Sequence, residues 1–182
     1  AFTAYTKLGK GYALLWQQAH SSHRTHAYLI AGPRGVGKAT FARYLAASLF
    51  CEKAEAPCGE CDACRRVLSG NEPDVLEIAS PDGKAISIER IREAIAAIAQ
   101  HAFGSGLRIV MIEPAEKLTP AAQNCLLKSL EEPPGNVLFL LLSHEPSALL
   151  GTIASRCAMV KLAPWPDDQL CEALLLLGYS QV

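Results

Sequence analysis

The chain has 182 residues, half of them hydrophobic, which is enough for one sizeable core and excludes a disordered protein. Its 17 basic and 18 acidic residues leave a net charge of -1, whereas an autonomous DNA-binding domain carries a positive surplus. The longest apolar runs, such as residues 137–142, fall far short of the roughly 18 residues that a membrane span needs, and the first residues show no secretion signal. We therefore expect a cytoplasmic protein without a membrane partner.

Short apolar runs alternate with stretches of helical periodicity along the whole chain. A short, mostly apolar run that ends abruptly is typical of a strand buried in a parallel sheet, and such runs occupy residues 27–31, 75–79, 108–112, 137–142 and 158–162. Hydrophobic residues three or four apart predict helices over residues 14–19, from 38, over 88–102, over 119–130 and from 167. Ser87 and the pair Thr119-Pro120 are residue types that begin helices. The alternation indicates an α/β fold in which helices flank a five-stranded, mostly parallel sheet.

The segment between the first expected strand and the next helix matches a phosphate-binding loop. Its glycines allow backbone amides to converge on an anion, the helix N-terminus adds partial positive charge, and Lys38 supplies a cation for the terminal phosphates. The alternative is a glycine turn that binds nothing. The expected nucleotide-binding residues are Gly32, Pro33, Gly35, Val36, Gly37, Lys38, Ala39 and Thr40.

Two positions of this expected pocket lack groups that nucleotide hydrolysis requires. The residue after the lysine normally carries a hydroxyl for magnesium, but here it is Ala39, and Thr40 lies about 100° further around the helix. The third expected strand should end in two acidic residues, yet it ends in Glu113 and Pro114, and proline is neither an acid nor a base. Glu116 is a weaker candidate for the missing base. We predict poor magnesium binding and impaired hydrolysis, and leave open whether ATP or ADP binds.

Four of the seven cysteines crowd into a short segment after the phosphate-loop helix, at Cys51, Cys58, Cys61 and Cys64. In a reducing compartment this spacing favours a metal over disulfides, and four thiolates complete a tetrahedral structural site. Iron-sulfur clusters are bound by cysteines at a similar spacing and are an alternative, as is a cysteine cluster without metal. We expect ordinary buried thiols at the remaining positions, Cys125, Cys157 and Cys171.

Taken together, these features resemble AAA+ clamp-loader subunits, and most closely the delta-prime subunits of bacterial DNA polymerase III. The resemblance covers nearly the whole chain and rests on the phosphate loop, the inserted cysteines, the segment 124–134 and Ser155-Arg156-Cys157. It implies an AAA+ nucleotide-binding domain over residues 1–163 with an inserted zinc module at about 51–64. Residues 164–182 would then be a linker and the beginning of a helical lid domain. The family's C-terminal collar domain is absent from this chain, which we interpret as a fragment.

The resemblance also implies roles for particular residues and partners. It implies that Arg156 reaches ATP held by a neighbouring subunit, where its guanidinium stabilises the charge of the transferred phosphoryl group. It places Ser143 and His144 at the nucleotide-sensing position, which usually holds a threonine pair. The implied partners are gamma/tau and delta subunits in a hetero-oligomer and, indirectly, the sliding clamp and primed DNA.

We expect this chain to be a hydrolysis-deficient stator that supplies Arg156 in trans. The alternatives are an active motor subunit resembling gamma/tau, or an AAA+ ATPase of another pathway. We interpret the scattered Arg90, Arg92 and Arg108 as a solvated face instead of a track for DNA phosphates.

Overall fold

A computed structural model describes residues 10–80, 83–99, 106–167 and 171, and a parallel sheet forms its centre. The five strands lie in the order β2-β3-β4-β1-β5, and each described pairing between neighbours is parallel. Their bounds are β1 Ala27–Ala31, β2 Val75–Ala79, β3 Arg108–Glu113, β4 Val137–Ser143 and β5 Ala158–Lys161. The expected fold class is confirmed, and the strands match their expected positions to within a residue at either end.

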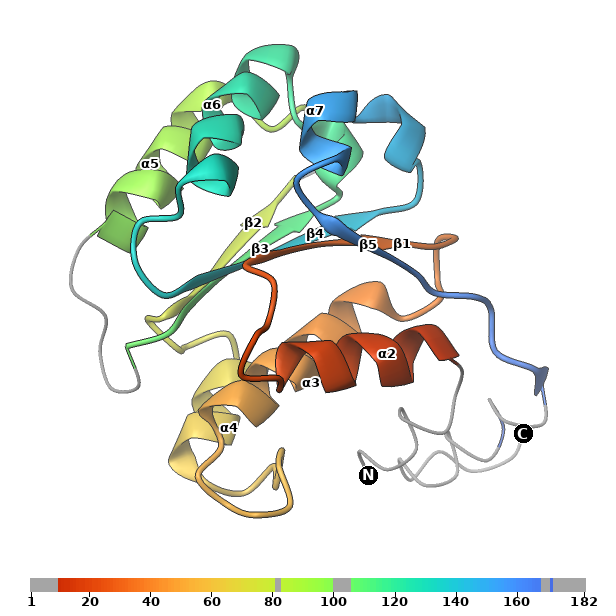
Figure 1. The fold of residues 1–182 in the computed structure, drawn as a ribbon. Helices are drawn as coiled ribbons and strands as arrows, with labels where there is room; N and C mark the ends of the chain where they lie inside the picture. Colours follow the sequence, from red (N-terminus) through yellow and green to blue (C-terminus); the bar gives the residue numbers. More distant parts are fainter. Residues whose placement is uncertain (1–9, 81–82, 100–105, 168–170, 172–182) are drawn as a thin grey trace.

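Helices cover both faces of the sheet: α2, α3 and α4 lie on one face, and α5, α6 and α7 lie on the other (Figure 1). Their bounds are α2 Lys10–Ala19, α3 Lys38–Phe50, α4 Asp62–Leu68, α5 Ile88–Ala99, α6 Pro120–Glu131 and α7 Gly151–Ala154, with 3-10 turns η2 Ala115–Lys117 and η3 Pro146–Ala148. Sequence periodicity missed α4 and α7 because both are too short to show a repeat. Residues 100–102 of one expected helix, and almost all of the expected helix from residue 167, lie outside the described residues.

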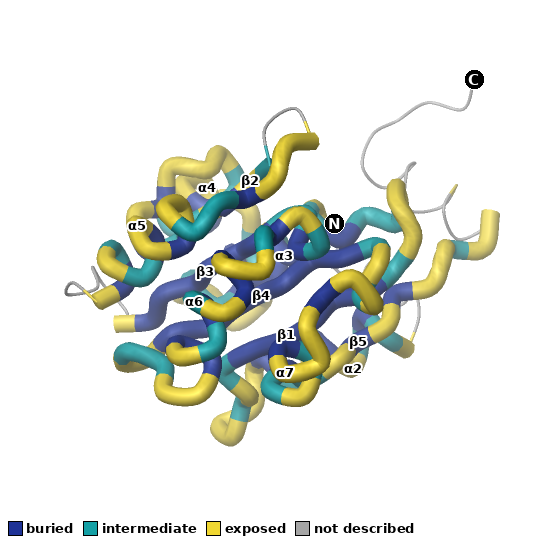
Figure 2. The backbone as a smooth tube through the Cα atoms, turned by 90° about the horizontal axis from the view of Figure 1, so that it is seen from above, coloured by how far each residue is buried: buried dark blue, intermediate teal, exposed yellow. Residues whose placement is uncertain are grey.

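The core consists of two layers because side chains alternate across the strands. On β1, Tyr28 and Ile30 face α2 and α3, whereas Ala27 and Leu29 belong to the opposite layer. Figure 2 shows the central strands as continuously buried segments, in contrast to the partly exposed edge strand β2. Burying one Leu or Ile side chain completely stabilises the folded state by about 1.5–3 kcal/mol relative to leaving it exposed. In the described part of the chain, no helix has the length and apolar character needed to cross a membrane.

Parallel pairing places the carboxyl ends of β1, β3 and β4 along one edge of the sheet. Ala31 of β1 is aligned with Ser143 of β4, and the next amide, that of Gly32, donates to the Ser143 carbonyl over 3.1 Å. The loop after β1 therefore begins beside the last residue of β4. Crevices at the carboxyl ends of strands are where open α/β sheets bind ligands.

One expected surface arginine is instead part of the core. Arg108 is 6% exposed, and its Nε lies 3.5 Å from Oδ1 of the fully buried Asp74. Arg90 is exposed, but its Nη1 donates to the Ala79 carbonyl over 2.6 Å. The interpretation of Arg108 as part of a solvated face was wrong, because pairing with Asp74 allows its charge to be buried between β2 and β3.

A single amide side chain ties α6 to the segment that leads into α7. Thr119 caps α6 as expected, accepting from the Ala122 amide over 3.2 Å. One turn later, the buried Gln123 donates from Nε2 to the Leu118 carbonyl over 3.1 Å, and its Oε1 accepts from the Leu150 amide over 2.7 Å. Gln123 thus satisfies two backbone groups that belong to different segments.

We expect Gln123→Ala to lower the free energy of unfolding by about 1–3 kcal/mol, because it leaves the buried Leu118 carbonyl and the Leu150 amide without their partner. Urea denaturation followed by circular dichroism measures the difference. Asn124→Ala is the matched control, since Asn124 is the next residue of the same helix and is exposed. Equal stabilities of the two variants would contradict the bridging role.

Candidate functional site

A pocket of about 590 Å³ lies at the carboxyl edge of the sheet. It brings together the phosphate loop, the end of β3 and the residue that follows β4, as the sequence analysis expected. Its lining residues are Arg34, Gly35, Gly37, Lys38, Ala39, Thr40, Ser80, Gly83, Glu113, Pro114, Lys117, Leu142 and His144.

Two glycines give the phosphate loop its backbone conformation, and a side chain of α2 is hydrogen-bonded to the loop. Gly35 and Gly37 have φ values of +79° and +84°, a left-handed conformation that other residues adopt only with strain. Gly37 precedes the first residue of α3, so the amide end of that helix faces the loop. The hydroxyl of the buried Tyr12 donates to the Val36 carbonyl over 2.6 Å, and the ring of Trp165 packs edge-on against Tyr12 at 5.7 Å.

Lys38 is turned back onto its own loop. Its Nζ donates to the carbonyls of Gly32 and Pro33 over 2.7 and 2.8 Å, and the residue is only 7% exposed. Burial lowers the pKa of Lys38, and the nearby carboxyls of Glu113 and Glu116 partly oppose that shift. A phosphate that entered the loop would compete with two carbonyls for the same ammonium group.

The two positions expected to be defective both belong to the pocket wall. Ala39 presents a methyl group where a magnesium-binding hydroxyl would be, although Thr40 lines the same pocket. Glu113 is half-buried, and burial raises its pKa against the lowering effect of Lys38 and Arg43. Pro114, beside it, offers no side-chain group that can take or give a proton.

His144 joins the phosphate loop to a buried carboxylate. Its Nε2 accepts from Nε of Arg34 over 3.0 Å, and its Nδ1 contacts Oε1 of Glu116. The side chain of Glu116 is 4% exposed, and Glu116 is not among the residues that line the pocket. The Ser143 hydroxyl accepts from the Glu145 amide over 3.1 Å and so orders the turn after β4. The sequence contains no spacing rule that could have predicted this contact between positions 34, 116 and 144.

Arg156 lies apart from this pocket, two residues after the end of α7. Its Nη1 donates to the Thr152 carbonyl over 2.9 Å, and its Nη2 lies 2.5 Å from Oε1 of Glu131 at the end of α6. The side chain is 34% exposed. Arg156 therefore presents a cation at the surface, and it is not among the residues that line the chain's own pocket.

The four expected cysteines converge between α3 and α4. Their sulfur atoms all lie within 4.8 Å of one another, and the Cys58–Cys64 and Cys51–Cys61 pairs are each 4.0 Å apart. A tetrahedral ion with metal–sulfur bonds of about 2.3 Å needs sulfurs about 3.8 Å apart. All four thiols are free, so the cluster fits a metal ion.

Backbone amides prepare part of this cluster for a cation. The amides of Cys61 and Cys64 donate to the sulfurs of Cys58 and Cys61 over 3.3 and 3.5 Å. Amide hydrogen bonds lower the pKa of Cys58 to about 6, whereas burial raises the pKa of Cys64. Elsewhere, Cys157 is buried as expected, but Cys125 is half-buried and Cys171 is exposed, so the expectation of buried thiols was wrong for these two.

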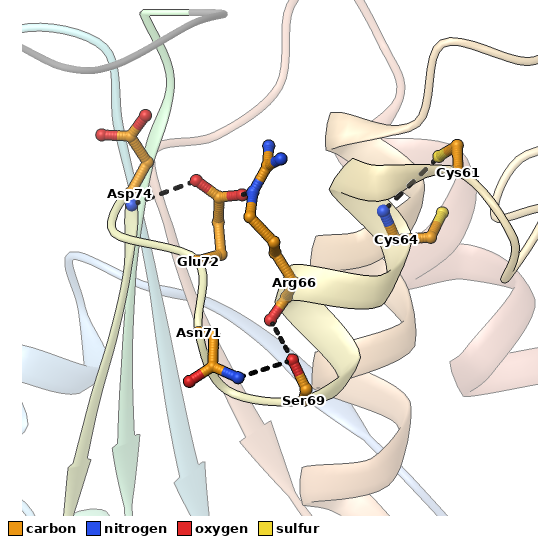
Figure 3. A network of polar contacts seen from close by, with 7 residues as sticks. All are labelled: Cys61, Cys64, Arg66, Ser69, Asn71, Glu72 and Asp74. Carbon is orange, nitrogen blue, oxygen red and sulfur yellow. Dashed lines mark hydrogen bonds and ion pairs between the residues drawn. The ribbon is translucent and has the colours of Figure 1, made fainter.

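Helix α4 and the polar contacts at its two ends link the cysteine cluster to the sheet (Figure 3). Cys61 caps α4, and from the same helix Nε of Arg66 donates to Oε2 of Glu72 over 2.8 Å. Glu72 is 6% exposed, and its Oε1 accepts from the Asp74 amide, just before β2, over 3.5 Å. An ion held by the cysteines would therefore stabilise a helix that is already tied to the edge of the sheet.

Comparison with known proteins relates the chain to subunits of DNA polymerase III. Residues 9–166 match the model of a family described as DNA polymerase III, delta subunit. The chain is 42% identical over 151 residues to DNA polymerase III subunit delta' of Pseudomonas aeruginosa, covering 78% of this chain and 46% of the relative. It is 38% identical over 148 residues to DNA polymerase III subunit tau of Escherichia coli, covering 80% of this chain and 23% of the relative. The chain thus spans less than half of either curated relative.

A solved structure is similar over nearly all of the fold. The gamma subunit-related protein of Thermotoga maritima superposes with a TM-score of 0.66 at 25% identity, covering 93% of this chain and 54% of that protein.

We expect the purified chain to contain one tightly bound metal ion, and Cys61→Ser to lose it, because a thiol is replaced by a poor ligand. Elemental analysis measures the metal-to-protein ratio, and thermal denaturation should show a lower Tm for the variant. Cys125→Ser, outside the cluster, should retain the ion. Loss of metal from both variants, or from neither, would contradict this assignment.

Proposed function

The chain belongs to the family described as DNA polymerase III, delta subunit, and we propose that it acts as a delta-prime-type subunit of a cytoplasmic clamp loader. Its partners would be gamma/tau and delta subunits, and through them the sliding clamp and primed DNA. Similarity to a curated delta' subunit and a curated tau subunit supports this assembly. Residues 164–182 would begin a helical lid domain, after the nucleotide-binding domain of residues 1–163.

The chain would serve as a stator with little or no hydrolysis of its own. The observation that carries this proposal is an asymmetry between two sites. The chain's own pocket has a methyl group at Ala39 and a pyrrolidine ring at Pro114, whereas Arg156 is intact, partly exposed and held by two partners. A guanidinium that enters a neighbour's pocket stabilises charge on the transferred phosphoryl group.

The phosphate loop would bind ATP or ADP weakly and with little help from magnesium. Glycines, the start of α3 and Lys38 remain available for phosphate oxygens, but Lys38 must first leave two carbonyls. Without a hydroxyl at position 39, Glu113 would be left as the carboxylate nearest to the ion's usual place, and it is half-buried with a raised pKa. His144 would occupy the sensing position, with its Nε2 accepting from Arg34 of the phosphate loop.

The metal of the cysteine cluster would be zinc in a structural role. Four thiolates fill a tetrahedral coordination sphere, so no position remains open for water or substrate. An iron-sulfur cluster needs room for inorganic sulfides, and the sulfur separations of 4.0 Å suit a single ion better.

An active motor subunit is the second candidate. The complete series of glycines and Lys38, together with a pocket of about 590 Å³, favours it. The two candidates differ in one measurable property, which is the rate at which this chain hydrolyses ATP without its partners.

We expect the purified chain to show negligible ATP hydrolysis with magnesium, since Pro114 cannot activate water. Ala39→Thr should raise magnesium-dependent nucleotide affinity about tenfold, or about 1.4 kcal/mol, by supplying the missing ligand. Isothermal titration with and without magnesium measures the gain. Ala39→Val is the matched control, because valine has the shape of threonine but no hydroxyl. Brisk turnover that Lys38→Ala abolishes would refute the stator and establish the motor.

Arg156→Ala, introduced into the assembled loader, should lower ATP turnover by the adjoining motor at least tenfold while assembly stays normal. The loss would come from uncompensated charge in the neighbour's transition state. Steady-state hydrolysis and gel filtration of the same preparation measure the two properties. Full activity in the variant complex would remove the trans role.

A further inference from the structure

We propose that Glu131 is a positioning residue for Arg156, which holds the guanidinium ready for a neighbouring subunit's nucleotide; this inference rests on the trans role proposed above. The contact is direct, because Nη2 of Arg156 lies 2.5 Å from Oε1 of Glu131. The second anchor is the Thr152 carbonyl, 2.9 Å from Nη1. Two different nitrogens are therefore engaged, which restricts the orientation of the planar group.

The anchored guanidinium can still bind a phosphate. An arginine has five N–H donors, and among the described residues the side-chain contacts with Thr152 and Glu131 engage one N–H group on each of two nitrogens. The side chain remains 34% exposed, so its other donors are accessible to a partner surface. Arg156 need not leave Glu131 in order to contact a nucleotide in the adjoining pocket.

The exposure of the pair argues against a mainly structural role. Glu131 is 49% exposed, and ion pairs at such positions add little to folding stability because solvent screens them and both side chains lose freedom. The same loss of freedom is useful where geometry matters, since a charge that is already oriented costs less to place in a transition state.

The backbone around Arg156 is also held in place. At the entrance to α7, the Leu150 amide donates to Gln123 of α6. At the exit, Glu131, the last residue of α6, contacts Arg156. Helix α6 therefore contacts both ends of the short segment that carries Arg156, and Glu131 extends this support from the backbone to the charged group.

The experiment introduces Glu131→Ala into the assembled loader and measures ATP turnover of the adjoining motor across ATP concentrations. We expect kcat to fall about 2- to 5-fold with KM unchanged, because an exposed pair of this kind orients a group that acts in the transition state. Glu131→Gln, which retains an oxygen that can accept from Nη2, should recover part of the loss. Glu132→Ala is the matched control, as it removes the same charge from the adjacent exposed position.

A double variant separates failure of this inference from failure of the trans role. Glu131→Ala should have no further effect in a complex that already carries Arg156→Ala, because Glu131 would act only through that side chain. Unchanged or increased turnover in Glu131→Ala, while Arg156→Ala is impaired, would overturn the positioning role alone. An additive loss in the double variant would overturn it as well. Full activity of Arg156→Ala would overturn the trans role and the inference together.

Discussion

Parallel pairing of β1 with β4 is the constraint from which the pocket arises. It aligns Ala31 with Ser143, so the loop after β1 and the turn after β4 leave the sheet at the same level. The pairing of β3 with β4 brings Glu113 to the same edge. Because β1 is buried on both faces and paired on both sides, the loop that follows it starts from a rigid base. Residues that are far apart in the sequence thereby come together around one cavity.

The pocket and the surface arginine differ in how completely their chemistry is preserved. Lys38 is present but occupied by its own loop, and the hydroxyl and acid that would accompany it are replaced by Ala39 and Pro114. Arg156, in contrast, is held by Thr152 and Glu131 and remains partly exposed at the surface. This difference between the pocket and the surface arginine is the basis of the proposed stator.

The fold was largely predictable, whereas the contacts that tune the site were not. Strands such as 27–31 consist of apolar residues, and Thr119 and Pro120 are residue types that begin helices. Both patterns can be recognised in the sequence alone. The convergence of the cysteines was visible in their spacing. In contrast, Arg108 meets Asp74, and Arg34 meets His144, across distant segments, and only the tertiary fold brings such pairs together. Short helices such as α7 escape detection for a different reason, because four residues are too few to show a hydrophobic repeat.

Tyr12 connects the segment that follows β5 with the phosphate loop. Its ring touches Trp165, in the segment that leaves the last strand, and its hydroxyl is bonded to Val36 in the loop after β1. Because one rigid phenol makes both contacts, a displacement of the departing segment changes the mechanical support of the loop, and the converse also holds. The chain thus has a built-in linkage between whatever follows residue 165 and the backbone that would surround a phosphate.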